Sequence, residues 1–217
     1  MIQLVDLWKT YRLRGRETHV ARGMNATFET GSAVALLGRN GAGKSSLLRM
    51  IAGTMDPDQG DILSTGTISW PVGFSGSFHP DLTGAQNTTF IARVYGVDTA
   101  ELRDFVEEFA ELGQHFHQPV RSYSSGMKSR LAFGVSMGIR FDTYLVDEVT
   151  AVGDASFRRK SEALFSERME SSSAIVVTHS LPLVERICDR VAVLEDGHLT
   201  FFDDVQEGID HHQNNLS

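Results

Sequence analysis

Residues 38–45, Gly-Arg-Asn-Gly-Ala-Gly-Lys-Ser, have the types and spacing that hold a polyphosphate, and they fit the P-loop pattern G-x-x-x-x-G-K-[ST]. Glycines let the backbone curl so that successive N–H groups point at phosphate oxygens. We expect Lys44 to reach the β- and γ-phosphates and the Ser45 hydroxyl to ligate Mg²⁺. ATP and Mg²⁺ are therefore the expected cofactors. The residues assigned here to nucleotide binding are Gly38, Arg39, Asn40, Gly41, Ala42, Gly43, Lys44, Ser45 and Ser46.

Two adjacent acids, Asp147 and Glu148, follow the apolar segment 143–146. A carboxylate at the end of a buried strand can lie beside a P-loop and hold Mg²⁺ through water, which is the role we assign to Asp147. Glu148 follows at once, so its side chain points elsewhere, toward the γ-phosphate, where it can polarise the attacking water. Without the P-loop, a pair of solvated acids at a strand end would be the favoured interpretation.

Strands alternate with helices around these motifs. The P-loop lies between the apolar segment 33–37 and a helix that begins at Lys44, which is the context the motif requires. Such alternation implies a mostly parallel sheet covered on both faces, and hence an α/β fold. Strands near 2–8 and 24–29 predict a small antiparallel β subdomain beside it. Further segments of this core are expected at strands 67–70, 143–146, 174–177, 191–194 and 199–202 and at helices 157–169 and 181–186.

A helical subdomain is predicted in the middle of the chain. Residues 73–84, rich in Gly, Ser and Phe, interrupt the strand–helix pattern. Helical spacing follows over 85–95, 99–111 and 125–139. We expect a subdomain of about residues 75–140 inserted into a single domain that spans residues 1–217. The polar tail at 206–217 is expected to fray.

The overall composition limits the function classes. The 217 residues are 41% hydrophobic and 22% charged, with a formal net charge of −8. This acidic balance argues against a broad electrostatic grip on nucleic acid, so no nucleic-acid partner is expected. No run of about 18 apolar residues occurs, so a role at a membrane would depend on a partner. The single cysteine, Cys188, fits a reducing compartment and a buried position.

Residues 123–128, Tyr-Ser-Ser-Gly-Met-Lys, resemble the Leu-Ser-Gly-Gly-Gln signature of ABC transporter ATPases. Ser124 and Gly126 keep the two positions that would contact phosphate, and three other positions differ. A helix N-terminus with a hydroxyl and bare N–H groups suits an anion, although an ordinary N-capped helix would look similar. The order is also that of the family, since Asp147 follows 23 residues after Ser124. The resemblance implies that Ser124, Ser125 and Gly126 complete the ATP site of a second subunit.

Two further segments agree with this resemblance. Residues 151–154 lie where ABC proteins carry the D-loop, which crosses the dimer interface, so Asp154 is implied to belong to the nucleotide site. His179 follows the strand 174–177 as the switch histidine of the family does, and it would touch the γ-phosphate. Tyr11 resembles the aromatic residue that stacks on adenine, with Trp8 and His19 as nearby alternatives.

One feature of the family is missing. ABC ATPases usually carry a glutamine ahead of the helical subdomain, where it ligates Mg²⁺ and couples to the membrane partner. Residues 72–80 contain no glutamine, and the next one, Gln86, is expected on the following helix. Ser75 and Ser77 are the alternatives, and the sequence does not choose between them.

Segments 69–84 and 123–154 resemble the polysaccharide-export branch of the ABC family, and most narrowly the capsular polysaccharide export ATPases of Gram-negative bacteria. The resemblance covers about residues 4–202. O-antigen or teichoic-acid export, and a non-hydrolysing ATP-binding structural subunit, are the alternative functions. Glu148 and His179 argue against the last of these, since degenerate sites commonly lose such residues.

The resemblance also implies partners and a location. It implies a head-to-tail homodimer with ATP between Lys44 of one copy and Ser124 of the other. It further implies two copies of a separate transmembrane permease, periplasmic export proteins reached through that permease, and a peripheral position on the cytoplasmic face of the inner membrane. Core packing is the alternative explanation of the aromatic residues expected near the permease groove, Phe74, Phe78, Phe90 and Tyr95.

Overall fold

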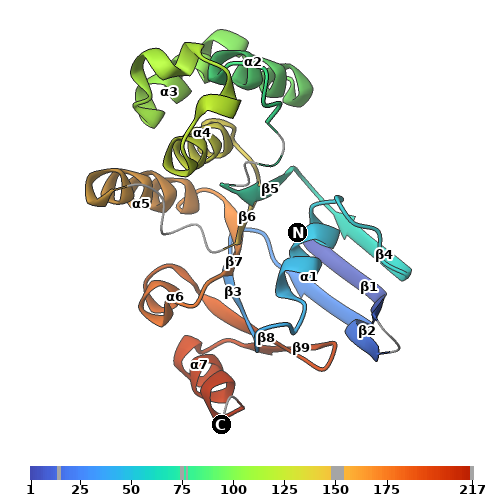
Figure 1. Ribbon diagram of the computed structural model, residues 1–217. Helices are drawn as coiled ribbons and strands as arrows, with labels where there is room; N and C mark the ends of the chain where they lie inside the picture. Colours follow the sequence, from blue (N-terminus) through green and yellow to red (C-terminus); the bar gives the residue numbers. More distant parts are fainter. Residues whose placement is uncertain (14–15, 74–75, 77, 148–153, 216–217) are drawn as a thin grey trace. The chain divides into compact units, whose positions relative to one another are not determined.

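The computed structural model describes residues 1–13, 16–73, 76, 78–147 and 154–215. The chain folds as two compact units, which Figure 1 shows as a sheet-containing unit and a helical unit. The first unit comprises Met1–Pro71, Phe141–Glu148 and Met169–Ser217. The second comprises Val72–Arg140 and Val149–Arg168.

The larger sheet of the first unit has six strands in the order β5-β6-β7-β3-β8-β9. Strand β3 runs parallel to both β7 and β8, β6 runs parallel to β7, and β9 is antiparallel to β8. Every residue of β3 and β7 is buried, which explains their uninterrupted apolar sequences and confirms the predicted mostly parallel sheet. The strands are β3 (Ala33–Leu37), β5 (Ile68–Val72), β6 (Thr143–Asp147), β7 (Ser173–Val177), β8 (Arg190–Glu195) and β9 (His198–Phe202).

A smaller antiparallel sheet has the order β2-β1-β4, from β1 (Ile2–Leu13), β2 (Arg16–Phe28) and β4 (Gln59–Ser64). The first two strands are longer than predicted, and β4 was not predicted at all. Five of the six β4 residues are exposed, so the strand has no buried face to give an alternating pattern. Its pairing with β1 determines it instead, and Gly60 (φ 83°) lies against the Asp6 backbone.

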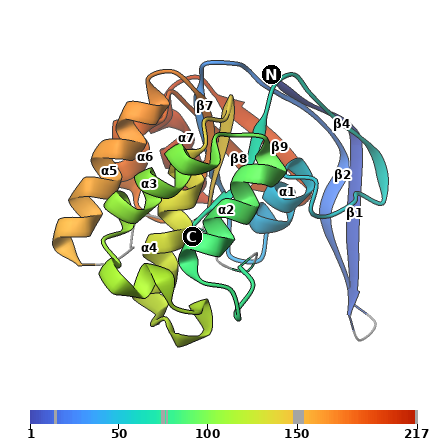
Figure 2. The same cartoon turned by 90° about the horizontal axis from the view of Figure 1, so that it is seen from above.

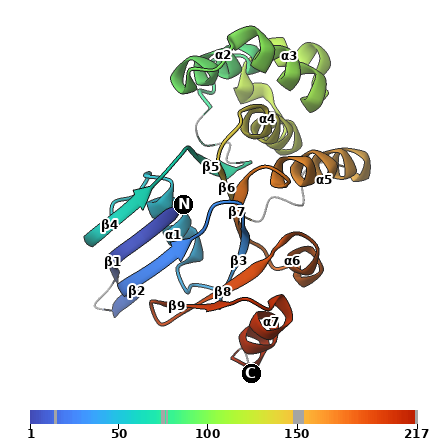
Figure 3. The same cartoon turned by 180° about the vertical axis from the view of Figure 1, so that it is seen from behind.

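Three helices complete the first unit: α1 (Lys44–Ile51), α6 (Leu181–Ile187) and α7 (Val205–Asn214). The prediction of a fraying tail at 206–217 was wrong for α7, which Figure 3 shows beside β8 and β9. Asp204 caps this helix by accepting a hydrogen bond from the Glu207 N–H at 2.8 Å. Ile209 is 2% exposed and anchors the helix, although the neighbouring residues are polar.

The second unit is built from helices, and Figure 2 shows α2, α3 and α4 side by side. The three helices predicted from helical spacing at 85–95, 99–111 and 125–139 agree with the observed ones to within one residue, and Thr83, Asp98 and Ser124 are their N-caps. Helix α5 was expected with the sheet, but Phe157 packs on Phe109 at 5.4 Å between ring centroids and joins the helix to this unit. The elements are α2 (Gly84–Tyr95), α3 (Thr99–Ala110), η2 (Gly113–His117), η3 (Val120–Ser122), α4 (Ser125–Gly138) and α5 (Ala155–Met169).

Candidate nucleotide-binding site

The loop between β3 and α1 can take its conformation because of its glycines. Gly38 (φ 152°) and Gly43 (φ 106°) both adopt backbone angles that favour glycine. A Cβ at Gly38 would lie 2.5 Å from the Leu194 carbonyl oxygen, and a Cβ at Gly43 would lie 2.5 Å from Val20 Cγ1. The P-loop is therefore enclosed on two sides, by β8 and by β2, and no larger residue fits at these positions.

The Lys44 side chain folds back onto the P-loop backbone. Its ammonium donates hydrogen bonds to the carbonyl oxygens of Gly38 (2.7 Å) and Arg39 (3.1 Å), so it lies over the loop. Lys44 is also the first residue of α1, where the helix dipole and the backbone N–H groups that open the helix favour an anion. Cation and helix N-terminus thus coincide, which is the arrangement that a polyphosphate requires.

A cavity of about 480 Å³ lies at this loop. Strands β3, β6 and β7 are parallel, so the residues that follow them meet at one edge of the sheet. Thr18 and Val20 of β2 and Val177 of β7 also line the cavity and were not predicted. The predicted site residues that the structure brings together there are Tyr11, Asn40, Gly41, Gly43, Lys44, Ser45, Ser46, Asp147 and His179.

Arg39 and Ala42 lie at a second cavity of about 500 Å³. Asn40 and Gly41 line both cavities, so this part of the loop separates them. Asn215, which directly follows α7, also borders the second cavity. Its side-chain amide donates a hydrogen bond to Glu195 Oε1 at 2.6 Å. The C-terminal helix therefore reaches the neighbourhood of the P-loop.

The donor atoms for a divalent cation are suitable. Ser45 offers a hydroxyl and Asp147 a carboxylate in the same cavity, and Mg²⁺ prefers oxygen ligands. Asp147 ends β6 in register with Val177 of β7, and His179 follows that strand by two residues. The residues present therefore fit Mg²⁺ beside the phosphates. Glu148 lies outside the described residues, as do Ser75 and Ser77, the candidates for replacing the missing glutamine.

Tyr11 lies at the cavity edge opposite Thr18 in the β1–β2 register. Its ring is 39% exposed, and its hydroxyl lies 3.2 Å from Ser46 Oγ and donates to Met55 Sδ at 3.0 Å. Trp8 and His19, the alternatives to Tyr11 for stacking on adenine, have other hydrogen-bond partners. The Trp8 indole N–H donates to Asp6 Oδ1 at 2.9 Å, and His19 Nδ1 lies 2.9 Å from Thr10 Oγ1.

Thr18 and Val20 have a recognisable signal in retrospect. They are two residues apart in β2, so their side chains lie on the same face of the strand. The pairing of Thr18 with Tyr11 places this face beside the aromatic residue. The sequence predicts the second strand only from residue 24, so the pairing of Tyr11 with Thr18 could not be inferred from it.

The remaining predicted residues belong to the second unit. Ser124 is the N-cap of α4, where its Oγ accepts a hydrogen bond from the Met127 N–H at 3.2 Å, and Ser125 and Gly126 open the helix. Asp154 Oδ1 accepts hydrogen bonds from the N–H groups of Ser156 and Phe157, both at 3.0 Å. The Phe157 bond is the main cause that holds the pKa of Asp154 below its usual range, with smaller contributions from the Ser156 bond and from Arg130.

Tyr123, from the signature-like segment, and Gln86, the first glutamine after residues 72–80, have structural roles. Tyr123, which precedes Ser124, is 5% exposed and donates a hydrogen bond to the His115 carbonyl oxygen at 2.6 Å. Gln86 forms a reciprocal capping box with Thr83: its N–H donates to Thr83 Oγ1 at 3.1 Å, and its Oε1 accepts from the Thr83 N–H at 2.9 Å. Gln86 therefore caps α2.

Comparison with known proteins adds four findings. Residues 21–151 match the family model of ABC transporters. The polysialic acid transport ATP-binding protein KpsT of Escherichia coli is 48% identical over 98% of this chain and 96% of its own length. The capsule polysaccharide export ATP-binding protein CtrD of Neisseria meningitidis serogroup B is 43% identical over 98% of both chains. A dimeric ATP-binding cassette solved in a post-hydrolysis state with ADP and Pi shares the fold, with a TM-score of 0.77 at 21% identity over 94% of this chain and 98% of its own.

Proposed function

The chain belongs to the ABC transporter family, and we propose that it is the ATP-hydrolysing subunit that powers export of a capsular polysaccharide through a separate transmembrane permease. Two kinds of support converge on this function. The relatives KpsT and CtrD are named for polysialic acid transport and for capsule polysaccharide export, and this chain matches them over nearly its whole length. The cavity at the P-loop supports it as well, because a cation, a carboxylate and an imidazole line it together.

The observation that carries the proposal is a single cavity lined by Lys44, Asp147 and His179. The Lys44 cation over the loop can bind the β- and γ-phosphates. The Asp147 carboxylate can hold Mg²⁺, and the His179 imidazole can contact the γ-phosphate. The three side chains come from α1, from the end of β6 and from the segment after β7. A loop that only bound phosphate would have no use for the last two.

Each residue then has a chemical role. Lys44 and the N–H groups that open α1 bind the phosphates. Ser45 and Asp147 hold Mg²⁺, which neutralises charge on the phosphates when it is bound. Glu148 accepts a proton from the attacking water and orients it, and His179 holds the γ-phosphate end in place. Tyr11 stacks on the adenine ring at the open edge of the cavity.

A second copy of the chain completes each site. The N-terminus of α4 offers the Ser124 hydroxyl and the N–H groups of Ser125 and Gly126, and these suit the γ-phosphate held by another copy. A head-to-tail pair gives two equivalent sites, as two-fold symmetry requires. The dimeric state named for the solved cassette with ADP and Pi supports this arrangement.

The permease is expected to contact α2. Phe90 is 59% exposed, Val94 61% and Tyr95 44%, so they form an apolar face that core packing does not explain. Phe78 is half-buried, and Phe74 lies outside the described residues. None of the helices in the described part of the chain has the length and apolar character needed to cross a bilayer. We place the protein on the cytoplasmic face of the inner membrane, with two permease copies and, through them, periplasmic export proteins.

The test is ATP hydrolysis by the chain co-expressed with its neighbouring membrane subunit, with wild type beside Glu148→Gln. We expect kcat to fall by about a hundredfold or more in the variant, because the group that orients the water is lost. The variant should still bind ATP and should accumulate as dimers. Lys44→Ala is the matched control, in which ATP binding itself is lost. Equal turnover in wild type and Glu148→Gln would contradict the proposed base.

The cargo needs its own readout. In a capsulated strain that lacks its export ATPase, the wild-type chain should restore polysaccharide at the cell surface. Glu148→Gln should leave the polymer inside the cell. Restoration of O-antigen in place of capsule in a matched O-antigen export mutant would overturn the assigned cargo while leaving the ATPase proposal intact.

A further inference from the structure

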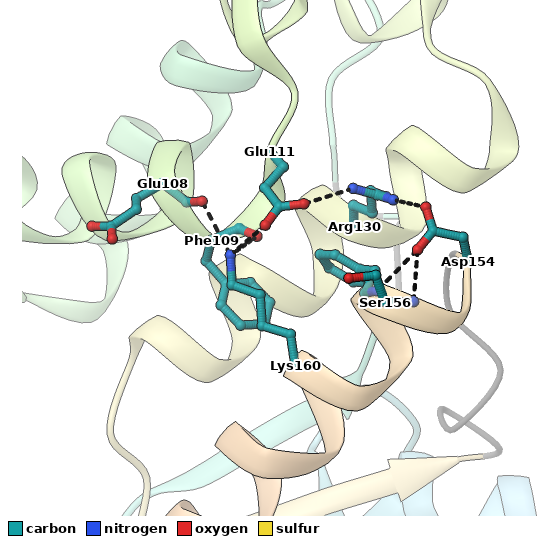
Figure 4. Close-up of polar contacts among 8 residues, drawn as sticks. Glu108, Phe109, Glu111, Arg130, Asp154, Ser156 and Lys160 are labelled. Atoms are coloured by element: carbon teal, nitrogen blue, oxygen red, sulfur yellow. Dashed lines mark hydrogen bonds and ion pairs between the residues drawn. The ribbon is translucent and has the colours of Figure 1, made fainter.

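Arg130 lies at the junction of three helices in the second unit, and Figure 4 shows its contacts. One terminal nitrogen donates to Asp154 Oδ2 at 2.8 Å and the other to Glu111 Oε2 at 3.4 Å. Arg130 lies in the second turn of α4, Asp154 directly precedes α5, and Glu111 is the C-cap of α3. One guanidinium therefore joins the helix that begins after Ser124 to the ends of two others.

The guanidinium is held in a fixed orientation. Its carbon lies 4.4 Å from the centre of the Phe157 ring, and the Arg130 side chain is only 18% exposed. Stacking on an aromatic face orients the planar fork, so its two donors point in set directions. A lysine at this position would keep the charge and lose both the stacking and the fork.

Asp154 uses its two oxygens for different partners. Oδ1 caps α5, whereas Oδ2 accepts from Arg130. Its side chain is 66% exposed, and ion pairs with such exposed groups contribute little to stability. The pair is consequently better suited to fixing direction than to stabilising the fold.

Glu111, the second partner of Arg130, is also held in place. Lys160 of α5 donates to Glu111 Oε1 at 2.8 Å and to the carbonyl oxygens of Phe109 (3.2 Å) and Glu108 (3.4 Å). It thereby satisfies carbonyls that the end of α3 leaves unpaired. Three ion pairs thus link Asp154, Arg130, Glu111 and Lys160 in series (Figure 4). The first and last residues of this series lie at the start of α5 and on α5, and α4 is linked to both through Arg130.

We propose that Arg130 and Asp154 are a positioning pair for ATP hydrolysis: they set the direction of α4, and hence where Ser124–Gly126 meet the nucleotide of a second copy. The inference rests on the proposed function, because Ser124 matters for turnover only if that second nucleotide binds there. Asp154 then acts through Arg130 and α4, and its carboxylate has no need to touch ATP. The Arg130–Asp154 pair controls the direction in which Ser124–Gly126 face the second copy.

Three variants of the full chain separate this role from general stability. Asp154→Asn keeps a capping acceptor for α5 and removes the charge that pairs with Arg130. Arg130→Met removes the pair and keeps an apolar stem, and Arg130→Lys restores charge alone. Arg103→Gln is the matched control, since Arg103 is exposed on α3 and pairs at 3.8 Å with the adjacent Asp104.

We expect kcat at saturating ATP to fall about three- to thirtyfold in Asp154→Asn and Arg130→Met, the range expected for residues that change coupling between sites. ATP affinity of the isolated monomer should stay within about twofold, because the P-loop is untouched. In the Glu148→Gln background, the same two changes should raise the ATP concentration needed for dimers. The double variant Asp154→Asn/Arg130→Met should be no worse than either single one, since both remove one interaction. Arg130→Lys should recover part of the lost turnover, and Arg103→Gln should match wild type.

Wild-type kcat and dimer formation in all pair variants would overturn the inference. So would additive losses in the double variant, or a parallel loss of ATP affinity and melting temperature, since these indicate a general structural role. A wild-type chain that neither hydrolyses ATP nor dimerises in the Glu148→Gln background would instead overturn the proposed function, and the inference with it.

Discussion

Val20 of β2 closes the space beside Gly43 of the P-loop, because a Cβ on Gly43 would lie 2.5 Å from Val20 Cγ1 and 2.9 Å from Cγ2. The small antiparallel sheet therefore supports the phosphate-binding loop directly. The same valine lines the nucleotide cavity, together with Thr18 two residues earlier. The strand shapes the site as well as supporting it.

Gly43→Ala is expected to destabilise the loop by about 2–5 kcal/mol, from backbone strain at φ 106° and from overpacking against Val20. Thermal unfolding and ATP affinity measure the two consequences. Gly31→Ala is the control: its φ is 79°, and nothing lies within 4 Å of the added carbon, so only the backbone cost of about 1–2 kcal/mol applies. The double variant Gly43→Ala/Val20→Ala should recover part of the loss. No recovery would show that Val20 is not the obstacle.

Tyr11→Ala is expected to weaken ATP binding by about 1–3 kcal/mol, the usual contribution of an aromatic ring stacked on a base. Tyr11→Phe should bind nearly as well as wild type, because it keeps the ring and loses only the contacts to Ser46 and Met55. Titration with inorganic triphosphate, which has no base, should show no effect of either change. Trp8→Ala is the control for the neighbouring aromatic residue. Equal weakening of ATP and triphosphate binding would exclude adenine stacking by Tyr11.

Tyr123→Phe is expected to cost about 0.5–1.5 kcal/mol of stability, because the part-buried 2.6 Å hydrogen bond from the Tyr123 hydroxyl to the His115 carbonyl oxygen would be lost. Tyr123→Leu, which restores the residue usual in the signature of the family, should cost more, about 2–4 kcal/mol, since it also leaves a void. Chemical denaturation measures both. The control is Ser122→Ala, which removes an exposed 2.7 Å bond to the Pro119 carbonyl oxygen. A Leu variant as stable as wild type would show that this position tolerates either residue.

His212 should make the folded protein sensitive to acid. Burial, helped by Lys44, lowers the pKa of His212 from its ordinary value of 6.5, and its Nδ1 is buried with no hydrogen-bond partner among the described residues. Because the folded state resists protonation, stability is complete above pH 6.5 and falls as pH drops below it. Glu195, His179 and His211 are the other charged or titratable groups that act on it.

The check is the melting temperature between pH 7 and about 5, for wild type and His212→Gln. Wild type should lose stability more steeply than the variant as pH falls. His198→Gln, a change at an exposed position of β9, should follow wild type. Parallel curves for wild type and His212→Gln would contradict the expectation.

Prediction from the sequence succeeded where local pattern determines the structure. The runs 33–37 and 174–177 are apolar throughout because their strands are buried on both faces. Helical spacing predicted helices over 85–95, 99–111 and 125–139, and in the structure the side chains of Thr83, Asp98 and Ser124 cap the helices found there. Prediction missed strand β4 and helix α7 for the opposite reason. Their exposed or polar residues carry little hydrophobic pattern, and their positions depend on contacts with β1 and β8.

The sequence by itself predicted a phosphate-binding loop at residues 38–45, because glycine spacing, Lys44 and Ser45 are requirements of adjacent residues on one loop. It also indicated the family, through short motifs whose order along the chain is readable. Only the tertiary structure decided that Thr18 and Val20 line the cavity of Lys44, and that Arg130 holds Asp154 and Glu111 at once. These partners are distant in sequence, and their meeting depends on strand register and helix packing, which no local pattern encodes.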